Sequence, residues 1–143
     1  MGRRGDRLDQ GLYDPAHGER VYAGLIERAA PVLDSGRVAV LDATWSRAVD
    51  RERARRFARE RGARVFLIET RCAASVAQAR LARREAQGSD PSDAGPGLHA
   101  RSAARFEPPA EWPAAGIRIV QTDRDDWRVA LHAIAAELSS PVD

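Results

Sequence analysis

The sequence predicts an α/β fold, a three-layer α/β/α arrangement in which helices cover both faces of a parallel sheet. Three short apolar segments, at residues 37–44, 63–70 and 116–123, lack regular polar alternation, as is typical of strands buried on both faces. Segments of helical length separate these strands, which is the connection that parallel strands require. The chain has 143 residues, which suffice for one domain with its own core.

The first element of the predicted domain is a helix. Residues 1–10 carry almost no apolar side chains, so we expect a disordered arm there and a domain over residues 11–143. Asp14 is a suitable N-cap, Pro15 suits the first helical position, and Gly36 lies just past the last apolar residue. The pattern therefore predicts a helix between Asp14 and Gly36.

Two more helices are expected after the first two strands. The segment 46–62 has Ser46 in position to cap it and Gly62 to end it. The segment 73–88 reads as a second crossover helix, and a polar stretch interrupted by proline and glycine follows at residues 89–97.

The last part of the chain contains a connection, a strand and a closing helix. Residues 98–113 predict a short helix that runs into a proline-rich connection to the third strand. The closing helix is predicted over residues 124–140. Its apolar side chains recur at helical spacing on one face, at Trp127, Leu131, Ile134 and Leu138.

Composition excludes several classes of function. No apolar run reaches the length of a membrane span, and with a single cysteine the chain fits a reducing cytoplasm. All 23 basic residues are arginine, so no mechanism can use a lysine of this chain. The net charge of +2 does not favour nucleic acid. One helix carries an arginine stripe, but acidic residues interleave with it, which indicates a solvated face; the stripe is Arg47, Arg51, Arg55 and Arg59.

The first candidate site lies where the first predicted strand ends. Open parallel sheets bind ligands outside the carboxyl ends of their strands. Asp42 closes the apolar run of this strand and Thr44 follows it. In nucleotide-binding proteins an acid at this place positions magnesium, often through water. An aspartate that simply caps a helix or belongs to a loop explains the pattern equally well.

The second candidate site is an arginine cluster on the helix at residues 73–88. Arg80 and Arg84 are four residues apart and share a face, and Arg83 lies beside them. The forked guanidinium group matches the oxygens of a phosphate. Periodicity alone favours the alternative, a solvated helix face in a protein rich in arginine.

Taken in order, these segments resemble a known family. "GLYDP…VY", the strand end "LDAT", the arginine-bearing "QARLARR" and the following "SDA" occur in the order and spacing of P-loop kinase-like ATPase domains of the AAA family. The resemblance covers roughly residues 11–123. It is greatest to the ATP-binding domain of bacterial proteins described as bifunctional aminoglycoside phosphotransferase/ATP-binding proteins, which are similar to zeta-toxin and nucleotide-kinase domains.

The resemblance implies a role for each matched residue. ATP and Mg²⁺ are the cofactors, and ATP-dependent phosphoryl transfer is the activity of the intact family. Asp42 resembles the catalytic acid on the magnesium side, with Thr44 beside it. Arg80 and Arg84 resemble catalytic lid arginines that face the nucleotide phosphates, and Arg83 accompanies them in binding the cofactor.

The chain also departs from this family. It contains neither G-x-x-x-x-G-K-[ST] nor any lysine, so the glycine loop that cradles phosphates is missing. We therefore expect an N-terminally truncated domain without its first, central strand, which is inactive alone and binds nucleotide only if a P-loop is supplied. The alternative is a non-catalytic module, without a cofactor, that binds a protein partner or a second copy through its exposed sheet edge.

Overall fold

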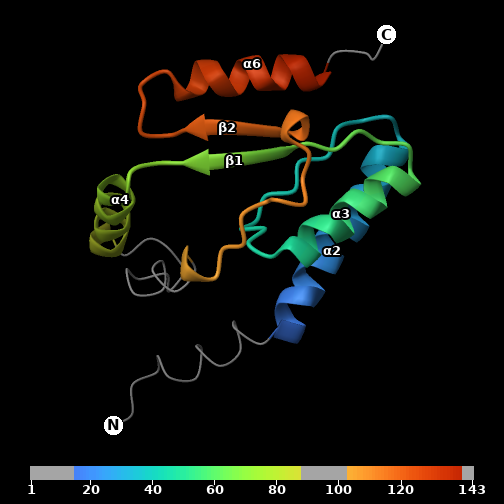
Figure 1. Cartoon of the computed structure of the whole chain (residues 1–143), viewed down its shortest axis with the longest axis horizontal. Coiled ribbons are helices and arrows are strands. Elements are labelled where there is room, and N and C mark those ends of the chain that lie inside the picture. Colours follow the sequence, from blue (N-terminus) through green and yellow to red (C-terminus); the bar gives the residue numbers. More distant parts are fainter. Residues whose placement is uncertain (1–14, 88–102, 140–143) are drawn as a thin grey trace. The chain divides into compact units, whose positions relative to one another are not determined.

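The computed structural model describes residues 15–87 and 103–139, which belong to two compact units, residues 1–64 and 65–143 (Figure 1). The predicted arm at residues 1–10, the proposed cap Asp14 and the polar stretch at 89–97 lie outside the described residues. The helices and strands are α2 (Pro15–Asp34), α3 (Ala48–Glu60), β1 (Leu67–Arg71), α4 (Ala74–Gln87), η1 (Ala114–Gly116), β2 (Ile117–Gln121) and α6 (Trp127–Ser139).

Helix α2 of the first unit has the predicted bounds. It begins at Pro15, whose fixed φ suits a first turn, and it continues through Pro31 to Asp34. Gly36 follows with φ +74°, and its N–H donates to the carbonyl of Leu33 at 2.9 Å. A glycine adopts this left-handed conformation without steric cost, so it ends the helix as the sequence predicted.

Helix α3 begins one residue later than the predicted cap implies. The residue at the N-cap is Arg47, which is extended and makes no side-chain capping bond, so the assignment of the cap to Ser46 is wrong. The carbonyl of Arg47 accepts from the N–H groups of Asp50 and Arg51, at 3.2 and 3.3 Å. Asp50 brings negative charge to the first turn, where the helix dipole favours it, and its buried carboxylate lies 3.8 Å from Arg47 Nε. The predicted end is confirmed, because Gly62 has φ +63°.

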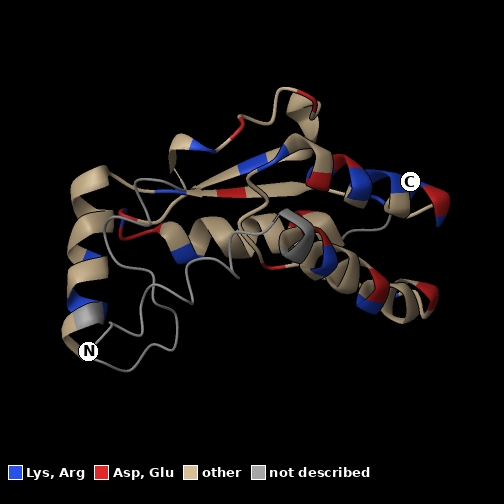
Figure 2. Ribbon diagram, turned by 90° about the horizontal axis from the view of Figure 1, so that it is seen from below, with Lys and Arg blue, Asp and Glu red and all other residues tan. Residues whose placement is uncertain are grey.

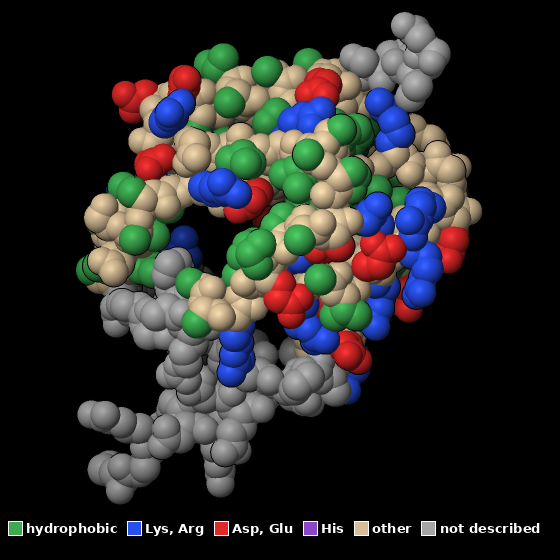
Figure 3. Space-filling view, viewed as in Figure 1, with side chains coloured by type: hydrophobic (Ala, Val, Ile, Leu, Met, Phe, Trp, Pro, Cys, Tyr) green, Lys and Arg blue, Asp and Glu red, His purple; other side chains and the backbone are tan. Residues whose placement is uncertain are grey.

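The arginines of α3 do not form one outward stripe. Arg51 is only 2% exposed, which corrects its place on the predicted outer face. Arg55 and Arg59 both bind Glu52, with N–O distances of 3.0 and 2.8 Å. Positive and negative side chains alternate along this part of the surface (Figures 2 and 3), as expected for a solvated helix face.

The strand predicted over residues 37–44 does not form. This segment connects α2 to α3 without regular structure and without pairing to any described strand, and Val38 and Val40 are 67% and 85% exposed. β-branched residues favour strands only where neighbouring strands provide backbone partners and packing, and the described residues supply no partner here. The prediction from apolar composition was therefore wrong at this position.

The second unit contains the parallel pairing that the sequence predicted. β1 and β2 pair from Leu67 opposite Ile117 to Arg71 opposite Gln121, and α6 lies along β2 (Figure 1). Val120 of β2 is 2% exposed. The α/β class is confirmed by these elements, while the three-layer arrangement stays a prediction because the described sheet has two strands.

The helix α6 and its connection to β2 follow the predicted pattern in part. Ile134 is buried, Trp127 and Leu138 are half-buried, and Leu131 is exposed. Of the short helix expected within 98–113, residues 98–102 lie outside the described residues, and Ala103 and Ala104 are helical. The prolines that follow cannot donate backbone hydrogen bonds, which explains the irregular path.

Two glycines of the first unit should respond in opposite ways to the same substitution. Gly62→Ala should destabilise the chain by about 1–2 kcal/mol, because a Cβ atom is strained in the left-handed conformation. Gly24→Ala, inside α2 with no described atom within 4 Å of its new Cβ, should stabilise it by about 0.5–1 kcal/mol. Urea unfolding measures both changes, and a shift of equal sign would contradict the described helix end.

Candidate functional site

Two of the predicted strand ends meet at one edge of the sheet. The parallel register sets Arg71 of β1 beside Gln121 of β2, so the residues that follow them leave the sheet together. Thr122 is held there directly: its N–H and its Oγ1 both donate to the carbonyl of Arg71, at 2.7 and 3.1 Å. This edge is the place where open parallel sheets bind ligands.

Helix α4 is tied to this edge by Arg80. Its Nη1 donates to Thr122 Oγ1 at 3.0 Å and its Nη2 donates to the Thr122 carbonyl at 2.6 Å. Both terminal nitrogens of the guanidinium group therefore bind a single residue 42 positions along the chain. Charge-assisted bonds of this forked kind are among the stronger hydrogen bonds in proteins.

A second tie holds the start of α4. The backbone N–H of Ala73, just before the helix, donates to Asp123 Oδ2 at 2.8 Å. The first N–H groups of a helix have no partner within it, and a carboxylate there also complements the helix dipole. Because Ala73 and Arg80 are two turns apart, roughly 10 Å along the axis, the two ties fix the direction of α4 as well as its position.

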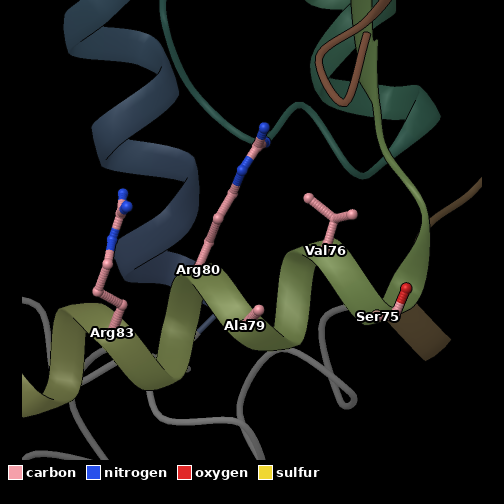
Figure 4. Close-up of a pocket in the computed structure, with 5 residues that line it drawn as sticks. All are labelled: Ser75, Val76, Ala79, Arg80 and Arg83. Atoms are coloured by element: carbon pink, nitrogen blue, oxygen red, sulfur yellow. The ribbon is translucent and has the colours of Figure 1, made fainter.

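One side of α4 borders a shallow depression of about 330 Å³. It is lined by Ser75, Val76, Ala79, Arg80 and Arg83. Figure 4 shows Val76, Arg80 and Arg83 projecting from the same side of the helix. Arg84, which the sequence placed on one face with Arg80, is exposed and does not line this depression.

The arginines of α4 differ in whether they bind other residues of the chain. Arg83 is exposed and makes no hydrogen bond or ion pair with any residue that the structure describes. The sequence of α4 contains three arginines, Arg80, Arg83 and Arg84, and one acid, Glu85, so its formal charge is positive. This helix therefore presents positive charge at the carboxyl edge of the sheet.

The acid in the middle of β1, Glu69, is already paired. Glu69 accepts from Arg71 through two bonds, Nε to Oε1 at 2.7 Å and Nη2 to Oε2 at 2.9 Å. The hydrogen bond with Glu69 raises the pKa of Arg71, and the charge of Glu69 adds to the effect. Because this pKa is raised, Arg71 keeps its positive charge through the physiological range and gives it up only in strong alkali.

In the first unit, Asp42 and Thr44 occupy the connection between α2 and α3. The Asp42 side chain is exposed and makes no hydrogen bond or ion pair with the described residues. Thr44 Oγ1 is hydrogen-bonded to the Tyr22 hydroxyl at 2.9 Å. Asp42 belongs to the first unit and the arginines to the second, and their membership of one site stays a prediction.

Trp45 fixes the turn that carries Asp42. Its φ of +44° lies in the left-handed region, which a bulky residue adopts only when its surroundings impose it. Its N–H donates to the Tyr22 hydroxyl at 3.2 Å, its Nε1 to the Leu41 carbonyl at 3.0 Å, and its carbonyl accepts from Arg51 Nη1 at 2.7 Å. No local pattern in the sequence predicts this role of Trp45.

The described residues contain no group of three His, Cys, Asp or Glu side chains able to hold a metal ion. Mg²⁺ bound with a nucleotide needs fewer protein ligands than that, because phosphates and water supply the others and one or two carboxylates suffice. The Asp42 carboxylate, which has no partner among residues 15–87 and 103–139, fits that limited role, with the Thr44 hydroxyl close along the chain. They do not fit a closed metal site.

Comparison with known proteins gives one family. The family model described as an AAA domain matches residues 1–109, which is more than half of the 143-residue chain. No curated protein and no solved structure matches the chain significantly. Within the described ranges, no helix is both long and apolar enough to cross a membrane.

The tie at the start of α4 is testable through Asp123. Asp123→Ala should lower the free energy of unfolding by about 1 kcal/mol, because the Ala73 N–H loses its acceptor. Asp125→Ala, which removes an exposed carboxylate from the same turn, is the matched control and should change stability by less than about 0.5 kcal/mol. Thermal or urea unfolding compares the two, and equal losses would contradict a specific capping role for Asp123.

Proposed function

This chain belongs to the AAA domain family, and we propose that it binds a nucleoside triphosphate, ATP in the first instance, together with Mg²⁺. The observation that carries the proposal is the arginine-bearing side of α4 at the carboxyl edge of a parallel strand pair. Ligands of open α/β sheets occupy this edge, and nucleotide binding is the property that the family suggests.

On the phosphate side of the proposed site, arginine side chains would bind the phosphate oxygens that a lysine binds in a Walker-type site. The 143 residues contain no lysine and no G-x-x-x-x-G-K-[ST] segment, so they supply no backbone cradle of that kind. The proposed phosphate-binding element is α4, on which the family resemblance implies Arg80, Arg83 and Arg84. Guanidinium groups match phosphate oxygens in geometry and remain charged at every physiological pH.

On the magnesium side, Asp42 is the proposed ligand, directly or through water, with Thr44 beside it. Two observations support this assignment. Mg²⁺ prefers oxygen ligands, and no described residue forms a hydrogen bond or ion pair with the Asp42 carboxylate. Magnesium supplies neutralisation of the phosphate charge when it is bound. The turn held by Trp45 and Tyr22 fixes the backbone from which Asp42 extends.

Binding is proposed here without efficient turnover. Phosphoryl transfer depends almost wholly on positioning and on stabilising the charge of the transferred group. A kinase-like activity would use Asp42, Arg80 and Arg84 as the catalytic residues, as the family resemblance implies. Because the glycine loop and its lysine are not encoded in these residues, we propose that they bind Mg-ATP and do not turn it over alone.

Magnesium dependence tests the role of Asp42. Wild-type chain should bind ATP more tightly with Mg²⁺ than with EDTA in isothermal titration calorimetry. Asp42→Asn should lose most of that difference, weakening Mg-ATP binding by about tenfold while leaving binding in EDTA unchanged. Asp125→Asn is the control with the same loss of charge, and an equal effect of both variants would refute the assignment.

A second candidate function rests on the exposed segment 37–44. Val38 and Val40 are largely exposed in a segment without regular structure, and the outer edges of β1 and β2 pair with no described strand. Such a segment can add to a sheet edge of a partner or of a second copy, which is the alternative of a non-catalytic interaction module.

Self-association distinguishes this alternative. Sedimentation velocity should show dimers that form with rising concentration, and Val40→Asp should abolish them because a charge would enter the new sheet. Val129→Asp, at a 71% exposed position of α6, is the matched control and should leave association unchanged. A chain that stays monomeric at high concentration would exclude the self-pairing form of this function.

A further inference from the structure

We propose that the two arginines lining the α4 depression have different tasks: Arg83 contacts the phosphates, and Arg80 is a positioning residue that holds α4 in place. This inference rests on the proposed nucleotide binding. It departs from the family resemblance, in which Arg80 itself is a catalytic lid arginine. The distinction follows from what each guanidinium group already binds.

The guanidinium group of Arg80 already binds another residue of the chain. Nη1 and Nη2 both donate to Thr122, at 3.0 and 2.6 Å, and Thr122 is in turn bound to the Arg71 carbonyl. Turning the fork of Arg80 toward a phosphate would break both bonds at once. It would also leave the Thr122 carbonyl without its charged donor, which costs free energy.

Arg83 extends from the helix that Arg80 holds, and its guanidinium group is available to bind an anion. It lies three residues beyond Arg80, about one turn along the same side of α4 (Figure 4). Its guanidinium group is exposed and has no hydrogen-bonding or ion-pair partner in the part of the chain that the structure describes. An anion that enters the depression therefore meets Arg83 without disrupting an existing contact.

The two attachments of α4 fix the backbone from which the Arg83 side chain extends. Asp123 binds the Ala73 N–H before the first turn, and Thr122 binds Arg80 two turns later. A binding side chain on a helix that is held at two points is better preorganised than one on a free helix or loop. Releasing Arg80 should consequently weaken the contribution of Arg83, although Arg80 does not touch the ligand.

A double-mutant cycle tests this division. Mg-ATP and inorganic tripolyphosphate are titrated into wild-type chain, Arg83→Gln, Arg80→Gln, Thr122→Val and the Arg80→Gln/Arg83→Gln double variant. Arg83→Gln should raise the Kd for both probes by about tenfold without changing the Tm. Arg80→Gln and Thr122→Val should lower the Tm and raise the Kd, and the double variant should bind no more than about threefold more weakly than Arg83→Gln.

Arg124→Gln, which removes an exposed positive charge near the same edge, should leave the Kd within about twofold of wild type. An unchanged Kd in Arg83→Gln, or effects of the two arginines that multiply in the double variant, would overturn the inference while wild-type binding keeps the proposed function. Wild-type chain that binds neither probe would overturn the proposed function, and with it the role of Arg83.

Discussion

The candidate site depends on the parallel pairing of β1 with β2. Because Arg71 lies opposite Gln121, the chain leaves both strands at one edge, and Thr122 can bind the Arg71 carbonyl. Thr122 and Asp123 then become the two attachment points of α4. A shift of one residue in this register would move both attachment points to the other side of the strand and separate them from the helix.

In the first unit, side-chain contacts and not a sheet hold the segment that carries a candidate site residue. The connection between α2 and α3 is held by Trp45, whose ring lies 4.7 Å from that of Tyr22 and whose backbone and indole make hydrogen bonds in three directions. The left-handed conformation at Trp45 is strained, and these contacts offset the strain. The exposed carboxylate of Asp42 is thus carried on a rigid turn, whereas the apolar stretch before it makes no strand pairing with described residues.

Local sequence patterns predicted most of the helices and two of the strands, because periodicity, proline and glycine act within a few residues. Gly36 and Gly62 ended their helices where expected. The prediction failed at residues 37–44, where a strand needs a partner that composition does not reveal. The site was predicted as a set of residue types, but its connections were not: Arg80 and Thr122 are 42 positions apart, and no spacing rule links them.

The contact between Tyr22 and Trp45 also gives the chain an optical reporter. A phenol that lies 4.7 Å from an indole passes the energy of absorbed light to it efficiently, so the emission of Trp45 depends on both rings staying together. Trp112 and Trp127 belong to the second unit and can be replaced by phenylalanine to leave this single emitter. The colour and intensity of its fluorescence would then follow the turn beside Asp42 in real time, without any added dye.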